Sequence, residues 1–336
     1  MLKPAVRTIW DSAFQTAPSG LVSRLTPAGL VAPCYHLVSD RPPAHVRQLF
    51  QCRNTSQFKA ELDWLLKRFK PVSLEDLNSK IAAREPIPAG SLFISFDDGL
   101  RECLDIVAPI CLAKGVPATF FISTGFTGNK SLCYRHKASL LAETWLRSGG
   151  ASVKTRKGAI TSYDAFREFV MQVKYEDVAE LDDCAKQMEV RFDDYLRTER
   201  PYLGEDDIAT LLRQGFSIGG HSVDHPLYSR IPFEAQVAQT EGCLRSLKEK
   251  FPLGTASFAF PFLANDVSER FIEHTLGSKT ADLIFYTGSV RPDHDGRVIW
   301  RFGVEVGDCS FGETWKRFIG QQQMGKAIST MKSVLR

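Results

Sequence analysis

The chain has 336 residues, of which 43% are hydrophobic, so it can bury a large core either in one domain with an insertion or in two domains. Its 42 basic and 39 acidic residues give a formal charge of +3, which excludes the dense basic field expected of a nucleic-acid partner. We find no run of 18 apolar residues and no signal-peptide core, and we therefore predict a cytoplasmic protein without a transmembrane segment. The eight cysteines form no Cys-x-x-Cys pair, and we expect most of them to be buried free thiols.

Hydrophobic periodicity predicts strands and helices that alternate along most of the chain. Short apolar runs favour buried strands, and apolar stripes spaced by three or four residues favour helices. The first strand ends at His36, and Pro33 would confine it to a sheet edge or stand at its start. The predicted elements in chain order are a leading helix at 6–14, a strand at 30–35, helices at 54–69 and after Ser73, a strand at 92–96, a helix at 101–114, a strand from 118, and then helices at 205–214, 233–250 and 266–276 that alternate with strands at 215–220, 256–261 and 282–288.

This alternation indicates a parallel sheet wound with helices, which is either a barrel or a doubly wound sheet. No Gly-x-Gly-x-x-Gly motif and no P-loop follows a predicted strand, which argues against a nucleotide-binding fold. Between about residues 127 and 203 the rhythm breaks into a weak alternation and two helical patterns. We interpret this stretch as an insertion that either selects substrate over the barrel mouth or only adds stability.

Two adjacent carboxylates, Asp97 and Asp98, follow the predicted strand at 92–96. A single Asp before Gly is ordinary turn chemistry, but two converging carboxylates repel each other unless a cation or a shared proton lies between them. His221 and His225 follow another predicted strand at a spacing of four residues, which places both imidazoles on one side of a turn. Pro226 disfavours a long helix there. The pattern predicts a divalent metal site.

Three segments resemble the motifs of the polysaccharide deacetylase family, carbohydrate esterase family 4. They are "SFDDG", "HSVDH" and "FAFPF", and the resemblance covers about residues 30–125 and 203–305. It implies an α/β fold, a distorted or incomplete (β/α) barrel of the TIM type, with a divalent metal that is usually zinc. We accordingly expect an N-terminal extension over 1–29 and a barrel over 30–336 that carries the mostly helical insertion at about 127–203.

The resemblance also implies roles for individual residues. Asp97 matches the general base, and Asp98, His221 and His225 match the metal ligands. The backbone amide of Phe262 matches a donor of the oxyanion hole.

Two positions depart from the family pattern. Ala259 stands where the family has the Arg that orients the base, and Phe262 stands where it has Tyr. This version of the motif resembles a branch of the family that acts on exopolysaccharide.

The general acid has no clear motif, because the family's Leu-x-His is absent from the sequence. His294 is our candidate, since Asp293 and Asp295 flank it and could hold its protonated form. His36 is the alternative, and we interpret His274 as a surface residue of a helix.

These features together predict a metal-dependent hydrolase whose partner is an N-acetylated carbohydrate. It would remove acetyl groups from the amino sugars of a polysaccharide or a glycan precursor. The alternative is a catalytically silent, metal-containing carbohydrate-binding protein. A metal-independent hydrolase of small cyclic amides is disfavoured, because all three metal ligands are present.

Overall fold

The structure is a computed structural model that describes residues 29–150, 152–156, 158–289, 293–305 and 310–320. The helix predicted at 6–14, and nearly all of the extension predicted over 1–29, lie outside these residues. Within the described ranges, no helix combines the length and the apolar character needed to cross a bilayer. The seven cysteines that the structure describes are buried free thiols, as predicted.

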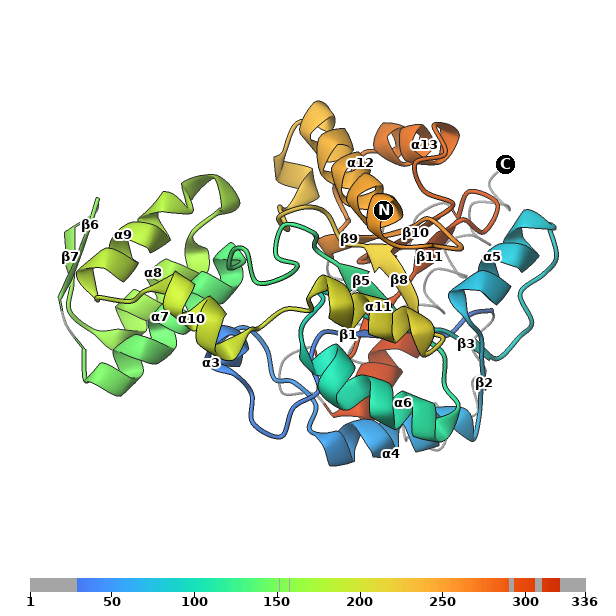
Figure 1. Cartoon of the computed structure of the whole chain (residues 1–336), viewed down its shortest axis with the longest axis horizontal. Helices are drawn as coiled ribbons and strands as arrows, with labels where there is room; N and C mark the ends of the chain where they lie inside the picture. The colour runs from blue at the N-terminus through green and yellow to red at the C-terminus, as the bar shows by residue number, and fades with distance from the viewer. Residues whose placement is uncertain (1–28, 151, 157, 290–292, 306–309, 321–336) are drawn as a thin grey trace.

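Eight short parallel strands form the central sheet, and most of their side chains are buried. Helices and loops surround the sheet, which lies at the centre of the larger part of the molecule (Figure 1). In spatial order the strands are β11 (Val298–Trp300), β10 (Leu283–Thr287), β9 (Ser257–Leu263), β8 (Ser217–Gly220), β5 (Ala118–Ile122), β4 (Ile94–Phe96), β1 (Pro33–Tyr35) and β12 (Phe302–Gly303).

The two outermost strands of this sheet are consecutive in the chain. β11 pairs with β10, β12 pairs with β1, and only Arg301 separates the two strands. The segment from Val298 to Gly303 therefore joins the ends of the sheet and makes a nearly closed barrel. This confirms the predicted distorted (β/α) barrel and excludes the doubly wound sheet.

The strand predicted at 92–96 is broken at Phe93. Its first part, β3 (Ser91–Leu92), pairs with β2 (Lys70–Pro71), and only its second part, β4, belongs to the barrel. Pro33 is the first residue of β1, where the missing N–H does not interrupt the ladder. The predicted helix at 101–114 begins with one π-helical turn, Cys103–Val107, and continues as α6 (Ala108–Lys114).

Helices of the expected kind connect the strands, and their caps explain where they begin and end. Asn54 and Gln57 form a capping box at the start of the first long helix, and Ser73 caps the next one. Gly115 ends α6 in the left-handed conformation, with φ 63°. The remaining bounds are α3 (Ala44–Arg47), α4 (Thr55–Leu66), α5 (Leu74–Ala82), α11 (Glu205–Arg213), the 3₁₀-helix η3 (Tyr228–Arg230), α12 (Phe233–Lys250) and α13 (Glu269–Gly277).

Helix α5 closes one end of the barrel. Leu74 and Leu77 pack in one buried cluster with the strand residues Phe121 and Phe285. Glu75 accepts a hydrogen bond from the hydroxyl of Ser217, the first residue of β8. The amino ends of the strands are thus covered by α5, and their carboxyl ends face the opposite side, towards the inserted residues (Figure 1).

The insertion between β5 and α11 forms a helical unit with its own apolar core, which we call the inserted unit (residues 133–199). Trp145 and Phe166 stack at 4.3 Å in this core. Two of its helices, α7 and α10, were not predicted. Its elements are α7 (Tyr134–Ser148), β6 (Val153–Thr155), β7 (Gly158–Ile160), α8 (Tyr163–Gln172), the 3₁₀-helix η2 (Tyr175–Asp177), α9 (Ala179–Gln187) and α10 (Phe192–Glu199).

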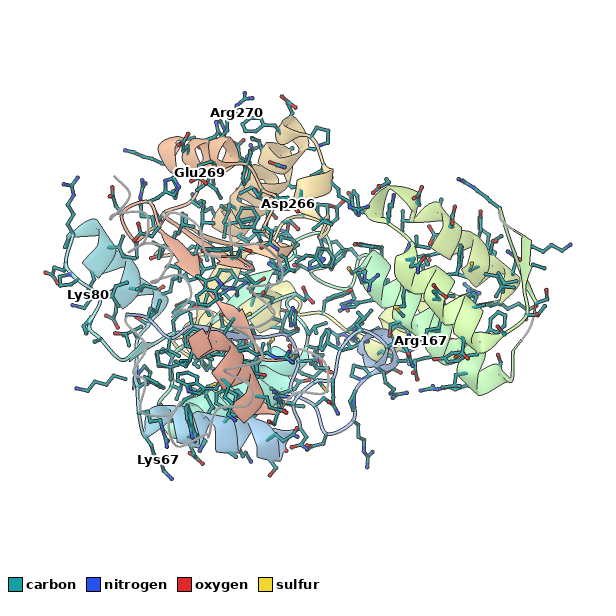
Figure 2. The ribbon with its side chains drawn as sticks, turned by 180° about the vertical axis from the view of Figure 1, so that it is seen from behind. Lys67, Lys80, Arg167, Asp266, Glu269 and Arg270 are labelled. Carbon is teal, nitrogen blue, oxygen red and sulfur yellow. The ribbon has the colours of Figure 1, made fainter. Side chains whose placement is uncertain are left out.

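The inserted unit packs against helix α3 of the barrel. Arg47 donates to Glu143 of α7 at 2.5 Å, and Gln48 accepts a hydrogen bond from Arg167 of α8 at 2.7 Å. The hydroxyl of Ser139 donates to the carbonyl of Ala44 at 2.7 Å. Figure 2 shows Arg167 where the inserted unit meets the barrel.

Candidate metal centre

Asp98, His221 and His225 converge at the carboxyl ends of β4 and β8. The Asp98 Oδ1 atom lies 3.4 Å from His221 Nε2 and 3.1 Å from His225 Nε2. The three candidate ligand atoms lie within 4.8 Å of one another, and all three residues are buried. The structure thus brings together the three residues that the sequence indicated as ligands.

Strained backbone aims these side chains at one point. Asp98 has φ 72° and Gly99 has φ 68°, so the chain turns at once after β4. Ser222 (φ 67°) and His225 (φ 61°) are also left-handed, in a loop rather than a helix. Non-glycine residues in this region cost about 1–3 kcal/mol each, and such strain gathers at functional sites.

Two glycines directly precede His221 in the chain. Gly219 and Gly220 lie within β8 and do not have positive φ. A Cβ atom at Gly219 would come within 2.5 Å of the Phe121 and Ser257 side chains. Gly219 therefore permits close packing inside the barrel.

The cluster fits a divalent cation. The carbonyl of Ala259 lies 2.9 Å from His221 Nδ1, so that nitrogen carries the proton and Nε2 has its lone pair free. Asp98 Oδ1 is buried and makes no hydrogen bond among the described residues. One carboxylate oxygen and two imidazole nitrogens form a donor set that zinc prefers.

A proton competes with an ion for this cluster. Burial raises the pKa of Asp98, but the attraction of His225 outweighs burial and brings that pKa well below its usual value. Burial lowers the pKa of His225, and Asp98 more than reverses this effect, raising it to about 9. Ion binding at neutral pH would therefore release a proton.

Asp97 is held apart from this cluster by Arg301. The two guanidinium nitrogens of Arg301 donate to the two oxygens of Asp97 at 2.7 Å each, and both residues are buried. Burial raises the pKa of Asp97, but Arg301 outweighs it and holds that pKa below the usual value. Asp97 is thus an ionised carboxylate in a fixed orientation next to the cluster.

His36 lies level with Asp97 at the barrel mouth. Tyr35 of β1 pairs with Phe96 of β4, so the next residues of the two strands, His36 and Asp97, are neighbours. Glu305 lies 2.6 Å from His36 Nδ1 and accepts hydrogen bonds from the backbone amides of His36 and Leu37. Burial lowers the pKa of His36, but Glu305 outweighs it and raises that pKa to about 9. His36 is therefore protonated at neutral pH.

Phe262 lies beside the cluster, near the end of β9. Its ring centroid is 4.6 Å from that of His225, and its φ of 57° is left-handed. The pairing of β9 with β10 shifts register close to this residue.

His294, our candidate for the general acid, lies at the other end of the barrel. The carbonyl of Arg297 accepts from the amide of Ile284 in β10, and Gly296 lies near Ile81 of α5. The turn that contains His294 is thus at the amino ends of the strands, and its ring pairs with Glu269. The prediction failed because the chain crosses the length of the barrel between β10 and β11. His274 is exposed on α13, as expected.

Sequence reasoning missed Arg301 and Glu305. Arg301 pairs with Asp97, although the sequence position that matches the family's Arg is Ala259. A signal was present in "VIWRFGVEV" (298–306), where single charged residues interrupt an apolar run. A charged residue in a buried strand needs a partner of opposite charge. The carboxylates at the ends of the predicted strands could have been recognised as such partners.

The fold is a (β/α) barrel with a group of buried polar residues at its mouth. A polysaccharide deacetylase family model matches residues 84–281, and the chain belongs to this family, whose members hydrolyse amide bonds. No curated protein matches the chain.

Solved structures of low sequence identity share the fold. The Streptococcus pyogenes deacetylase PplD in complex with acetate is 13% identical, with a TM-score of 0.55 over 88% of this chain and 99% of that one. IcaB from Ammonifex degensii is 17% identical, with a TM-score of 0.55 over 89% and 98%. A de-N-acetylase from Aggregatibacter actinomycetemcomitans is 13% identical, with a TM-score of 0.51 over 85% and 99%.

Proposed function

We propose that this protein is a metal-dependent deacetylase that removes acetyl groups from N-acetylated amino sugars of a polysaccharide or glycan precursor. The observation that carries the proposal is the separation of two adjacent carboxylates into different environments. Asp98 faces two imidazoles, and Asp97 faces Arg301. Family membership and a neighbour described as a de-N-acetylase support the amide as the bond that is cleaved.

Asp98, His221 and His225 would hold the cation, with zinc as the expected metal. When bound, a divalent cation lowers the pKa of water to about 7 and polarises a carbonyl oxygen. Among the described residues, three protein ligands converge in the cluster, so coordination positions would remain for water and substrate.

Asp97 is the proposed general base. It takes a proton from water as the water oxygen attacks the acetyl carbon, and Arg301 keeps both carboxylate oxygens in place. The backbone amide of Phe262 is the proposed donor to the developing oxyanion. Removing one donor of this kind raises the barrier by about 3 kcal/mol in enzymes where it has been tested.

His36 is the proposed general acid, in place of His294. The C–N bond breaks as His36 gives a proton to the sugar nitrogen, which leaves as an amine while acetate remains. Glu305 holds Nδ1, so Nε2 is the nitrogen that can donate, and about a third of the His36 side chain is exposed.

Acetate release from N-acetylglucosamine oligomers, measured with and without added zinc, tests the proposal. Metal content is determined on the same protein. We expect stoichiometric metal and acetate release that a chelator abolishes and zinc restores. Tight metal binding without acetate release from any N-acetylated sugar would instead indicate a silent carbohydrate-binding protein.

The cytoplasmic location stays a prediction, which cell fractionation tests.

A further inference from the structure

We propose that the groove between the inserted unit and the loops after β8 and β9 binds the part of the glycan next to the reacting sugar, and that this part carries an anionic group. The inference rests on the proposed function and names its substrate class. We call this groove the side groove. It consists of an inner hollow lined by Phe262 and Leu263 and an outer hollow lined by Lys174 and Arg230.

The side groove lies beside the candidate metal centre. The outer hollow has a volume of about 350 Å³ and the inner one about 370 Å³, and both are lined by Tyr134, Arg135 and Leu227. Phe262 lines the inner hollow, and its ring lies 4.6 Å from that of His225. A chain whose acetamide reaches the cluster can therefore extend outwards along the inserted unit.

The inner hollow is suited to a sugar ring. Tyr134, Leu227 and Phe262 line it, and Leu263 extends it with a side chain that is 57% exposed. The rings of Tyr134 and Phe262 lie 6.4 Å apart. The C–H faces of pyranose rings are apolar, and they pack against aromatic and aliphatic surfaces of this kind.

The outer hollow is suited to an anion. Arg135, Lys174 and Arg230 line it, and the one acid among its lining residues is Glu176. Among the described residues, no carboxylate forms an ion pair with Lys174 or Arg230, and both side chains are exposed. Asp266 adds an acid to the lining of the inner hollow and belongs to the barrel (Figure 2). The positive charge is therefore concentrated away from the cluster.

A contact within the inserted unit fixes the position of Arg135. Arg135 donates to the carbonyl of Met171 at 2.5 Å, which ties α7 to the end of α8. Arg135 and Arg230 both line the outer hollow together with Tyr134. An arginine guanidinium binds carboxylate and phosphate groups well, because two of its N–H groups can donate to two oxygens at once.

The wall of the groove is also linked to the loop that carries His225. The hydroxyl of Tyr175, in the inserted unit, donates to Asp224 at 2.6 Å. The rings of Tyr175 and Tyr134 lie 6.0 Å apart. The inserted unit is thus positioned against the cluster through the same residues that form the groove.

Acetate release from three oligosaccharides of equal length tests the proposal. They are a neutral N-acetylglucosamine hexamer, a hexamer that alternates N-acetylglucosamine with glucuronic acid, and an N-acetylglucosamine oligomer linked by phosphates. In the zinc-loaded protein, we expect the double variant Lys174→Gln/Arg230→Gln to lose about tenfold in kcat/KM on an anionic oligomer and less than twofold on the neutral one. Comparison of the two anionic oligomers distinguishes carboxylate from phosphate.

The matched control is Lys186→Gln/Arg191→Gln, which removes two exposed cations elsewhere on the inserted unit and should leave all three rates unchanged. Equal losses on neutral and anionic oligomers in the groove variant would overturn the proposal while leaving deacetylation intact. If the wild-type protein releases acetate from none of them, the proposed function fails. Calorimetric binding of the same oligomers to the Asp97→Asn variant then decides the groove assignment, and equal affinities with and without the two cations would overturn it.

Discussion

The barrel mouth and the inserted unit differ in the kind of side chain that they bury. The mouth buries three carboxylates, two imidazoles and a guanidinium, and four of its non-glycine residues have left-handed backbone. The inserted unit buries an apolar core around Trp145 and Phe166 and keeps most of its ion pairs at the surface. Charge and strain are unfavourable for folding, so the mouth depends on the barrel for its stability. The inserted unit has a core of its own.

The largest effect should follow removal of a ligand at the mouth. His221→Ala, and likewise Asp98→Asn, should release the metal and reduce acetate formation to background, because each supplies one donor to a single cluster. Metal analysis and acetate assays measure this. His274→Ala, at an exposed histidine, is the control and should change neither. Full metal content in His221→Ala would show that the cluster is not the site.

The next largest effect should separate the two carboxylates. Asp97→Asn should keep its metal and lose about 10²–10⁴-fold in kcat, because the amide cannot take a proton. The variant also leaves Arg301 without a full countercharge, so its melting temperature is measured beside the metal content. Identical metal loss in Asp97→Asn and Asp98→Asn, with both proteins folded, would contradict the division of roles.

A core substitution tests whether the inserted unit is independent of the mouth. Phe166→Ala should lower stability by about 3–5 kcal/mol, because the ring is fully buried against Trp145. Hydrogen exchange should show the loss in the inserted unit, while zinc affinity stays within twofold of wild type. Leu146→Ala, at a side chain that is 57% exposed, should cost less than about 0.5 kcal/mol. A fall in zinc affinity in Phe166→Ala would show that the regions are coupled.

The smallest effect at neutral pH concerns His36. Its pKa of about 9 means that the acid is protonated below that pH, so the basic limb of kcat/KM should lie near pH 9. Glu305→Gln removes the group that raises this pKa, and the limb should move down by about two pH units. The same interaction stabilises the fold fully below pH ~6.5 and fades as pH rises through 9. If the basic limb of Glu305→Gln stayed near pH 9, a group other than His36 would be responsible for it.

The sequence predicted those parts of the site whose residues stand close together in the chain. Asp97 and Asp98 are adjacent, and His221 and His225 are four residues apart, so chemistry and spacing were readable without the fold. Arg301 lies 204 residues from its partner Asp97, and only barrel closure brings the two together. The sequence pattern does not show which distant residues become neighbours when the barrel closes. For this reason, Ala259 suggested that the partner of Asp97 was missing.

Hydrophobic periodicity explains which elements the sequence predicted and which it missed. Strands and helices of the barrel alternate with clear periodicity, and α12 has the predicted bounds. Helix α7 has no clean apolar stripe because it is buried on several sides, and its buried residues include His136, Ser139 and Glu143. Periodicity fails where polar side chains pack between two units.

Barrel closure by residues 298–303 has a consequence for biosynthesis. A chain grows from its N-terminus, so Asp97, Asp98 and both histidines are made well before Arg301 and Glu305. Until that late segment arrives, the proposed base and the proposed acid lack the groups that set their orientation and charge. The nascent chain therefore contains the proposed ligands early and the partners of the proposed proton-transfer residues late, so the site is complete only after residues 301–305 have been made.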